Sequence, residues 1–157
     1  MNVPRKDRVL FLDIDGVLNT PQDRMYPDPD ECLTKELLAR LDAFVSEVQC
    51  SIVISSSWRY RHTVFSLRQV FARHGFANVE AIIDFTPDLQ TGAWNNLFAE
   101  RGLEIDAWLK EHSEATHYAI LDDTNDMVHL VSHFVQVDDV TGITNADLVK
   151  IKDILES

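Results

Sequence analysis

The chain has 157 residues, of which 45% are hydrophobic and 25% are charged. This length and this balance predict one ordinary domain over residues 1–157 with a single core, and they exclude a disordered or fibrous chain. The formal net charge of −12 would repel phosphate backbones and argues against strong general binding of nucleic acid.

The first predicted element is a buried strand over residues 9–14, an almost continuously apolar run that ends at Asp15-Gly16. Residues 20–33 carry three prolines and several aspartates without periodicity, which indicates an exposed loop. Thr34 is a plausible N-cap for the helix that follows, in which apolar residues recur at helical spacing as far as Val48.

The rest of the chain continues this alternation of strands and helices. A buried strand over 51–54 breaks into three serines, and a helix with apolar residues from Val64 to Phe71 ends at Gly75. The remaining predicted elements are strands at 79–85, 118–121 and 134–137 and helices at 104–111 and 146–155. The pattern predicts an α/β fold, a mostly parallel Rossmann-like sheet flanked by helices, with ligands at the carboxyl ends of the strands.

Three of the apolar runs end in polar residues that would meet at one edge of this sheet: Asp13 and Asp15, then Ser55, then Asp122 and Asp123. Carboxylates brought so close repel one another unless a cation neutralises them, and hard oxygen ligands favour Mg²⁺. Each piece also has a simpler explanation, because Asp is a common turn residue after a strand and serine is a common helix cap.

Taken together, these segments resemble a known family. Phe11-Leu-Asp13-Ile-Asp15-Gly16-Val-Leu-Asn19 resembles the first motif of the haloacid-dehalogenase-like (HAD) hydrolases, and the other three motifs resemble Val53-Ile-Ser55, Arg101 and Ile120-Leu-Asp122-Asp123. Residues 55–59 and 101–109 are similar to the small HAD domains of RNA-repair proteins, which are related to the phosphatase domain of polynucleotide kinase. The family often has Lys in the third motif, where this chain has Arg101.

The resemblance implies a Mg²⁺-dependent HAD-type phosphatase that hydrolyses phosphoric monoesters. Asp13 would be the nucleophile and form an aspartyl-phosphate, and Asp15 would act first as general acid and then as general base. Ser55 and Arg101 would bind the phosphoryl group. A second aspartate in the first motif separates phosphatases from dehalogenases, so dehalogenation is disfavoured.

The same resemblance implies the metal ligands. Asp13, the backbone carbonyl of Asp15 and Asp122 would hold Mg²⁺, with Asp123 either a direct ligand or an orienting neighbour. Asp126 is at least as readily explained as a loop or helix-cap residue, and we leave it out of the site.

Two alternatives belong to other classes of protein. One is a non-catalytic phosphate-binding or phosphotransfer module like a response-regulator receiver domain, but receivers place their paired acids at the first strand, whereas this chain has its acid pair late. The other is a zinc site at His129 and His133, which have i, i+4 spacing but lack the glutamate of HExxH.

The segments between the motifs are too short for a separate cap domain. We therefore expect an open site that suits a phosphorylated small molecule enclosed by loops or a phosphate on a large molecule. Residues 20–33 and 86–100, the latter with Trp94, are candidate lids.

Residues 58–74 form a basic stripe in an acidic chain, with four arginines and no acidic residue. Arg68 and Arg73 suit the solvated face of a helix. Arg59 and Arg61 follow Ser55 closely and are a candidate substrate rim, beside Trp58 and Tyr60, which either stack on a base or pack inward. This rim favours nucleotide or nucleic-acid-end phosphates as substrates.

The remaining features concern location. Cys32 and Cys50 have no CxxC spacing, which argues against a disulfide framework or a zinc knuckle and favours a reducing cytoplasm. The apolar run after Arg8 is interrupted by Asp13 and is too short for a secretory signal. No run approaches about 18 apolar residues, so we expect no membrane span. The sequence leaves the oligomeric state open.

Overall fold

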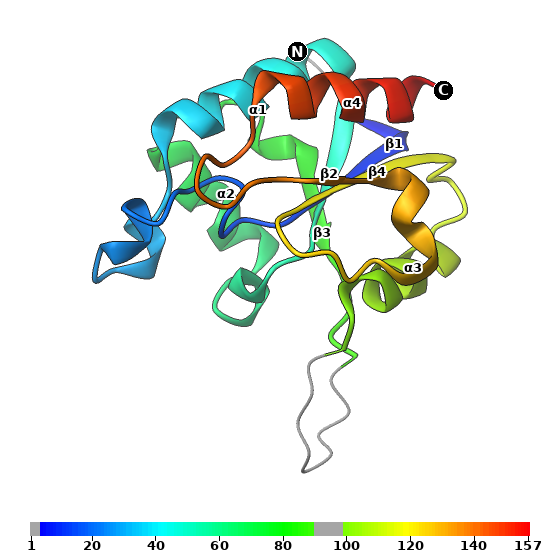
Figure 1. Ribbon diagram of the computed structural model, residues 1–157, viewed down its shortest axis with the longest axis horizontal. Coiled ribbons are helices and arrows are strands. Elements are labelled where there is room, and N and C mark those ends of the chain that lie inside the picture. The colour runs from blue at the N-terminus through cyan, green and yellow to red at the C-terminus, as the bar shows by residue number, and fades with distance from the viewer. Residues whose placement is uncertain (1–3, 90–98) are drawn as a thin grey trace.

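A computed structural model of the protein (Figure 1) describes residues 4–89 and 99–157. Five strands form one parallel sheet in the order β3-β2-β1-β4-β5. The strands and helices are β1 Arg5–Leu12, α1 Lys35–Val48, β2 Cys50–Ile54, α2 Val64–Arg73, β3 Ile82–Phe85, α3 Arg101–Lys110, β4 His117–Asp122, β5 Phe134–Gln136 and α4 Asn145–Glu156. The predicted α/β fold with a parallel sheet is confirmed.

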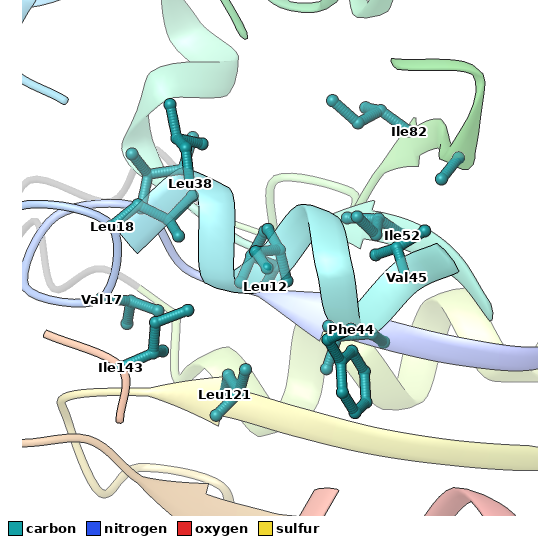
Figure 2. Close-up of a cluster of buried hydrophobic side chains, with 14 of the residues drawn as sticks. Leu12, Val17, Leu18, Leu38, Phe44, Val45, Ile52, Ile82, Leu121 and Ile143 are labelled. Carbon is teal, nitrogen blue, oxygen red and sulfur yellow. The ribbon is translucent and has the colours of Figure 1, made fainter. Parts of the chain in front are cut away.

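The sheet is covered on both faces because successive side chains of β1 alternate between two cores. Leu10 and Leu12 belong to the larger core, which also contains the buried faces of α1, α2 and α4. Figure 2 shows Leu12 in this core with Leu38, Phe44 and Val45 of α1. Val9 and Phe11 point to a smaller core with residues of α3. Burial on both faces explains the continuously apolar strands of the sequence.

Several predicted boundaries are wrong by a few residues. β1 ends at Leu12 rather than at Ile14, because the carbonyl of Ile14 already accepts turn hydrogen bonds from Val17 and Leu18. Residues 79–81 form a short 3₁₀ helix, and only 82–85 form the strand.

Helix α3 begins at Arg101, one turn before the predicted start at residue 104. Asp126, distant in sequence, accepts a hydrogen bond from the Arg101 N–H through its side chain and one from the Gly102 N–H through its carbonyl. A side chain at Gly102 would lie 2.3 Å from the carbonyl oxygen of Met127, so glycine permits this close approach.

The described residues contain no separate cap domain. The predicted loop over residues 20–33 contains two 3₁₀ helices, Asp23–Met25 (η1) and Pro29–Glu31 (η2), and lies outside the sheet (Figure 1). Of the second candidate lid, residues 90–98 with Trp94 lie outside the described residues. No described helix is long and apolar enough to cross a membrane.

Candidate active site

The polar residues predicted to converge do lie at the carboxyl ends of β1, β2 and β4. The backbone N–H of Asp13 donates to the carbonyl of Leu121 at 3.0 Å, and that of Ser55 donates to the carbonyl of Leu12 at 2.8 Å. These bonds extend the strand pairing by one residue, so the side chains of Asp13 and Ser55 start from rigid backbone.

Three carboxylates form a cluster at this edge. One oxygen from each of Asp13, Asp122 and Asp123 lies within 4.8 Å of the other two. Asp13 and Asp122 are buried, being 4% and 1% exposed. Gly16, with a φ of +80°, packs against Asp123, the third carboxylate, since a β-carbon on residue 16 would lie 2.4 Å from Oδ2 of Asp123. Hard oxygen donors at this spacing could bind a divalent cation such as Mg²⁺.

Arg101 projects from the first turn of α3 into this cluster. Its Nη1 lies 2.9 Å from Oδ1 of Asp13 and 3.3 Å from Oδ2 of Asp122. The same nitrogen donates to the backbone carbonyl of Ser55. One guanidinium therefore joins all three strand ends, as expected for a residue that stabilises charge at a common centre.

The electrostatics of the cluster favour an added cation. Burial raises the pKa of Asp13 above its usual range, although Arg101 opposes the shift. Burial and the neighbouring Asp13 raise the pKa of Asp122 as well. The pKa of Arg101 is raised although burial alone would lower it, because Asp13 and Asp122 lie beside it. A single arginine does not offset the acidic cluster, and a divalent cation would favour its ionised form.

Ser55 brings an unused polar group to the same place. Its hydroxyl is buried and has no hydrogen-bond partner among the described residues. Buried hydroxyls are normally paired, since leaving one unpaired costs about 1–3 kcal/mol. The carbonyl of the same residue accepts from Arg101, so Ser55 belongs to the strand edge that carries the acidic cluster.

Asp15 lies beside the cluster but its carboxylate is not one of the three clustered groups. Its Oδ1 accepts hydrogen bonds from Nδ2 of Asn19 at 2.9 Å and from Nε1 of Trp58 at 3.1 Å. Trp58 is only 2% exposed, so it packs inward and orients Asp15 rather than offering a stacking surface. Asn19 also accepts from the Gly16 N–H at 2.8 Å, which ties the whole first motif together.

Arg59 and Arg61, predicted together as a substrate rim, have different environments. The side chain of Arg59 is 9% exposed and forms an ion pair with the buried Glu104, in which Nη2 donates to both carboxylate oxygens at 2.8 and 3.0 Å. The charge of Arg59 is therefore already neutralised by Glu104. Arg59 also lines a cavity of about 290 Å³ beside Arg101. Arg61 is 40% exposed and lies over the Trp58 ring, at 4.8 Å from the centroid. Only Arg61 fits the description of an accessible rim cation.

The residues left out of the site are accounted for elsewhere. Asp126 interacts with the start of α3, as its helix-cap interpretation predicts. Nε2 of His129 lies 3.3 Å from Oδ1 of Asp106, whereas Nδ1 of His133 lies within hydrogen-bond distance of the Tyr118 carbonyl, at 3.0 Å. Both histidines lie on a 3₁₀ helix rather than an α-helix. The two histidines do not form a zinc pair. Cys32 and Cys50 are free thiols.

Two site residues had no role assigned from the sequence. Asn19 is a fully buried polar residue that ends the first motif. A polar residue directly after the apolar Val17-Leu18 is the sequence feature that could have indicated its role. Glu104 resembled an ordinary residue in the first turn of a helix, and nothing local distinguishes it.

Comparison with known proteins agrees with this geometry. The family model described as the HAD domain in Swiss Army Knife RNA repair proteins matches residues 9–148, a range that includes every predicted site residue. A search of curated proteins finds no match. The family match implies phosphohydrolase-type chemistry carried by acidic residues. The chain thus belongs to the family of HAD domains found in Swiss Army Knife RNA repair proteins.

Proposed function

We propose that the protein is a Mg²⁺-dependent phosphomonoester hydrolase that works through an aspartyl-phosphate on Asp13. The observation that carries this proposal is the orphaned hydroxyl of Ser55, which lies at the same strand edge as a buried carboxylate and an arginine. A phosphoryl group at this place would accept from Ser55 and from Arg101 while it faces the Asp13 carboxylate.

The reaction proceeds in two steps. A carboxylate oxygen of Asp13 attacks phosphorus and the bond to the leaving oxygen breaks, while Asp15 donates a proton to that oxygen. Water then attacks the phosphorus of the aspartyl-phosphate as Asp15 takes its proton, and the bond to Asp13 breaks. The hydrogen bonds of Asn19 and Trp58 to Oδ1 hold the Asp15 carboxyl group in place for both transfers.

Mg²⁺ would be held by Asp13, Asp122 and Asp123, with the backbone carbonyl of Asp15 as a further ligand. When bound, it neutralises the carboxylates and the phosphate charge, which otherwise repel. The residues fit this ion because all three side-chain donors are carboxylate oxygens within 4.8 Å of one another.

The substrate class follows from the openness of the site. In the absence of a cap in the described residues, a phosphorylated small molecule or a nucleic-acid end can reach Asp13. Arg61 gives the rim one accessible cation, which favours nucleotide phosphates. The net charge of −12 opposes long polymers, so mononucleotides and short oligonucleotides should bind best, and more weakly at high salt.

The test is hydrolysis of 4-nitrophenyl phosphate with Mg²⁺, with chelator, and with the Asp13→Asn variant. We expect turnover that chelation abolishes and that Asp13→Asn removes without unfolding the chain. Turnover that survives chelation would remove the metal from the mechanism, and full activity of Asp13→Asn would exclude Asp13 as nucleophile. Binding of phosphate without turnover would instead favour the regulatory phosphate-binding module.

A further inference from the structure

A cavity of about 250 Å³ opens beside Asp15, between the segment that carries η1 and η2 and the turn that carries Trp58. One part of its lining is apolar, formed by Tyr26 and Pro29, and another is cationic, formed by Arg24 and Arg61. Its volume is below that of pockets for drug-sized ligands, about 300–1,000 Å³. The cavity therefore suits a single small ring with a charged substituent.

Both arginines form only weak ion pairs with their acidic partners. Nη2 of Arg24 lies 3.6 Å from Asp139, whose side chain is 53% exposed, whereas its Nη1 donates to Oδ1 of Asn19 at 3.0 Å and to the Asn19 carbonyl at 3.3 Å. Arg61 lies 3.4 Å from Asp30, but the same Asp30 oxygen is closer to His62, at 2.7 Å. Partly exposed pairs at such distances are weak, and Asp30 would keep His62 if Arg61 turned to a ligand. Arg61 can thus exchange Asp30 for a stronger anion, and Nη2 of Arg24 can exchange Asp139 while Nη1 stays on Asn19.

The position of the cavity relative to Asp15 decides which part of a substrate it would hold. Under the proposed mechanism, Asp15 protonates the leaving oxygen, so the leaving group must lie on the Asp15 side of the phosphorus. Asn19 and Trp58 both bond Oδ1 of Asp15, and no described residue donates to Oδ2. The cavity is lined by Asp15 itself, and the Trp58 indole that orients it lies under Arg61.

We propose that this cavity is the leaving-group subsite, and that it selects phosphomonoesters whose leaving alcohol is a small ring bearing a second phosphate. The ring packs on Tyr26 and Pro29, and the second phosphate binds Arg61 and Arg24. This inference rests on the proposed function, because it uses the role of Asp15 as the acid. It adds a substrate preference that the acidic cluster alone does not set.

In the test, the sugar of a nucleotide serves as the small ring. Initial phosphate release is compared for a nucleoside 3′,5′-bisphosphate and for the 3′- and 5′-monophosphates of the same nucleoside. Product analysis identifies which phosphate leaves. We expect kcat/KM for the bisphosphate to exceed that of the matching monophosphate by about tenfold, the size expected for one added charge-assisted contact. Arg61→Gln should remove most of this preference. Arg24→Gln should remove it as well and also lower kcat on every substrate, because Arg24 bonds the Asn19 that holds Asp15. Arg73→Gln, which changes an exposed arginine at the end of α2 outside the cavity, should leave the preference intact.

The outcomes separate this inference from the proposed function. Hydrolysis of 4-nitrophenyl phosphate together with equal kcat/KM for bisphosphate and monophosphates would overturn the subsite while leaving the phosphatase. An equal loss on all substrates in Arg61→Gln would do the same, because it would mark a structural role for Arg61.

A chain inactive on 4-nitrophenyl phosphate would contradict the proposed function, and the subsite is then judged by binding. The dissociation constants of the bisphosphate and the monophosphates are measured by calorimetry with the Asp13→Asn variant, which needs no turnover. Tighter binding of the bisphosphate that Arg61→Gln weakens supports the subsite, and equal dissociation constants refute it.

Discussion

Glu104 and Arg59 form a buried ion pair whose loss we expect to lower stability and activity together. The Glu104 side chain is 3% exposed, and its Oε2 also accepts from the backbone N–H of Leu89 at 3.0 Å. Arg59 further donates to Oγ1 of Thr86 at 2.8 Å. Since Glu104 lies one turn after Arg101, the pair fixes α3 against the turn that follows Ser55.

The cost of breaking this pair can be worked out from its burial. Glu104→Gln leaves the guanidinium of Arg59, only 9% exposed, without a compensating charge. Removing one partner of a buried pair costs about 3–5 kcal/mol, and glutamine, which keeps one acceptor oxygen, should fall near the lower value. For a chain of this length each kcal/mol lowers Tm by about 2–4 °C, so we expect a fall of roughly 6–12 °C.

The assay is thermal unfolding followed by circular dichroism, with two further variants. Glu104→Gln/Arg59→Met removes both charges and should recover most of the loss, because neither charge is then left unpaired. Glu47→Gln breaks an exposed pair with Lys152 and should cost less than about 1 kcal/mol. If Glu104→Gln melted no lower than Glu47→Gln, or the double variant were the least stable, the buried pair would not have the role inferred here.

Activity gives a second readout of the same variant. Measured well below the melting temperature, Glu104→Gln should lower kcat about tenfold or more, because small displacements of a charge-stabilising group are costly. Unchanged kcat together with the expected loss of stability would show that Arg101 is positioned without this pair.

Three further predictions concern the acidic cluster. Asp15→Asn should lower kcat by about 10²–10⁴ for a substrate with a poor leaving group. Where dephosphorylation does not limit the rate, the loss should be smaller for 4-nitrophenyl phosphate. An equal loss of kcat on both substrates would then count against Asp15 as the leaving-group acid. Gly16→Ala should cost about 1–3 kcal/mol of stability, because residue 16 has a φ of +80°. It should also weaken the apparent Mg²⁺ affinity in a metal titration, because the added β-carbon would lie 2.4 Å from Oδ2 of Asp123. Unchanged Mg²⁺ affinity would refute the link between Gly16 and the position of Asp123. Burial raises the pKa of Asp13 and Asp122, so the folded state binds more protons than the unfolded one. Without Mg²⁺, the free energy of unfolding should therefore fall as the pH rises from about 4 through the raised values, and Mg²⁺ should oppose this fall. Denaturation curves with the same pH dependence in wild type and Asp13→Asn would contradict this.

The sequence alone predicted the sheet and the position of the acidic cluster. Short apolar runs such as 51–54 are long enough to mark buried strands, and parallel strands bring their carboxyl ends to one edge. Asp13, Ser55 and Asp122 therefore had to meet, although they come from three distant segments. The roles of nucleophile and acid predicted for Asp13 and Asp15 came from the resemblance of the first motif to the family, and they stay predictions.

Tertiary structure decided which charges and rings are available. Arg59 and Arg61 are equivalent in the sequence, but Arg59 meets Glu104, a residue 45 positions away, and loses its accessible charge. The indole of Trp58 bonds Asp15, 43 positions away, and Trp58 is only 2% exposed, so its ring cannot serve as a base-stacking platform. Helix α3 begins three residues early because Asp126 bonds its first N–H groups. Local patterns register burial and periodicity, whereas a polar pair between distant segments depends on the three-dimensional path that brings its two groups together.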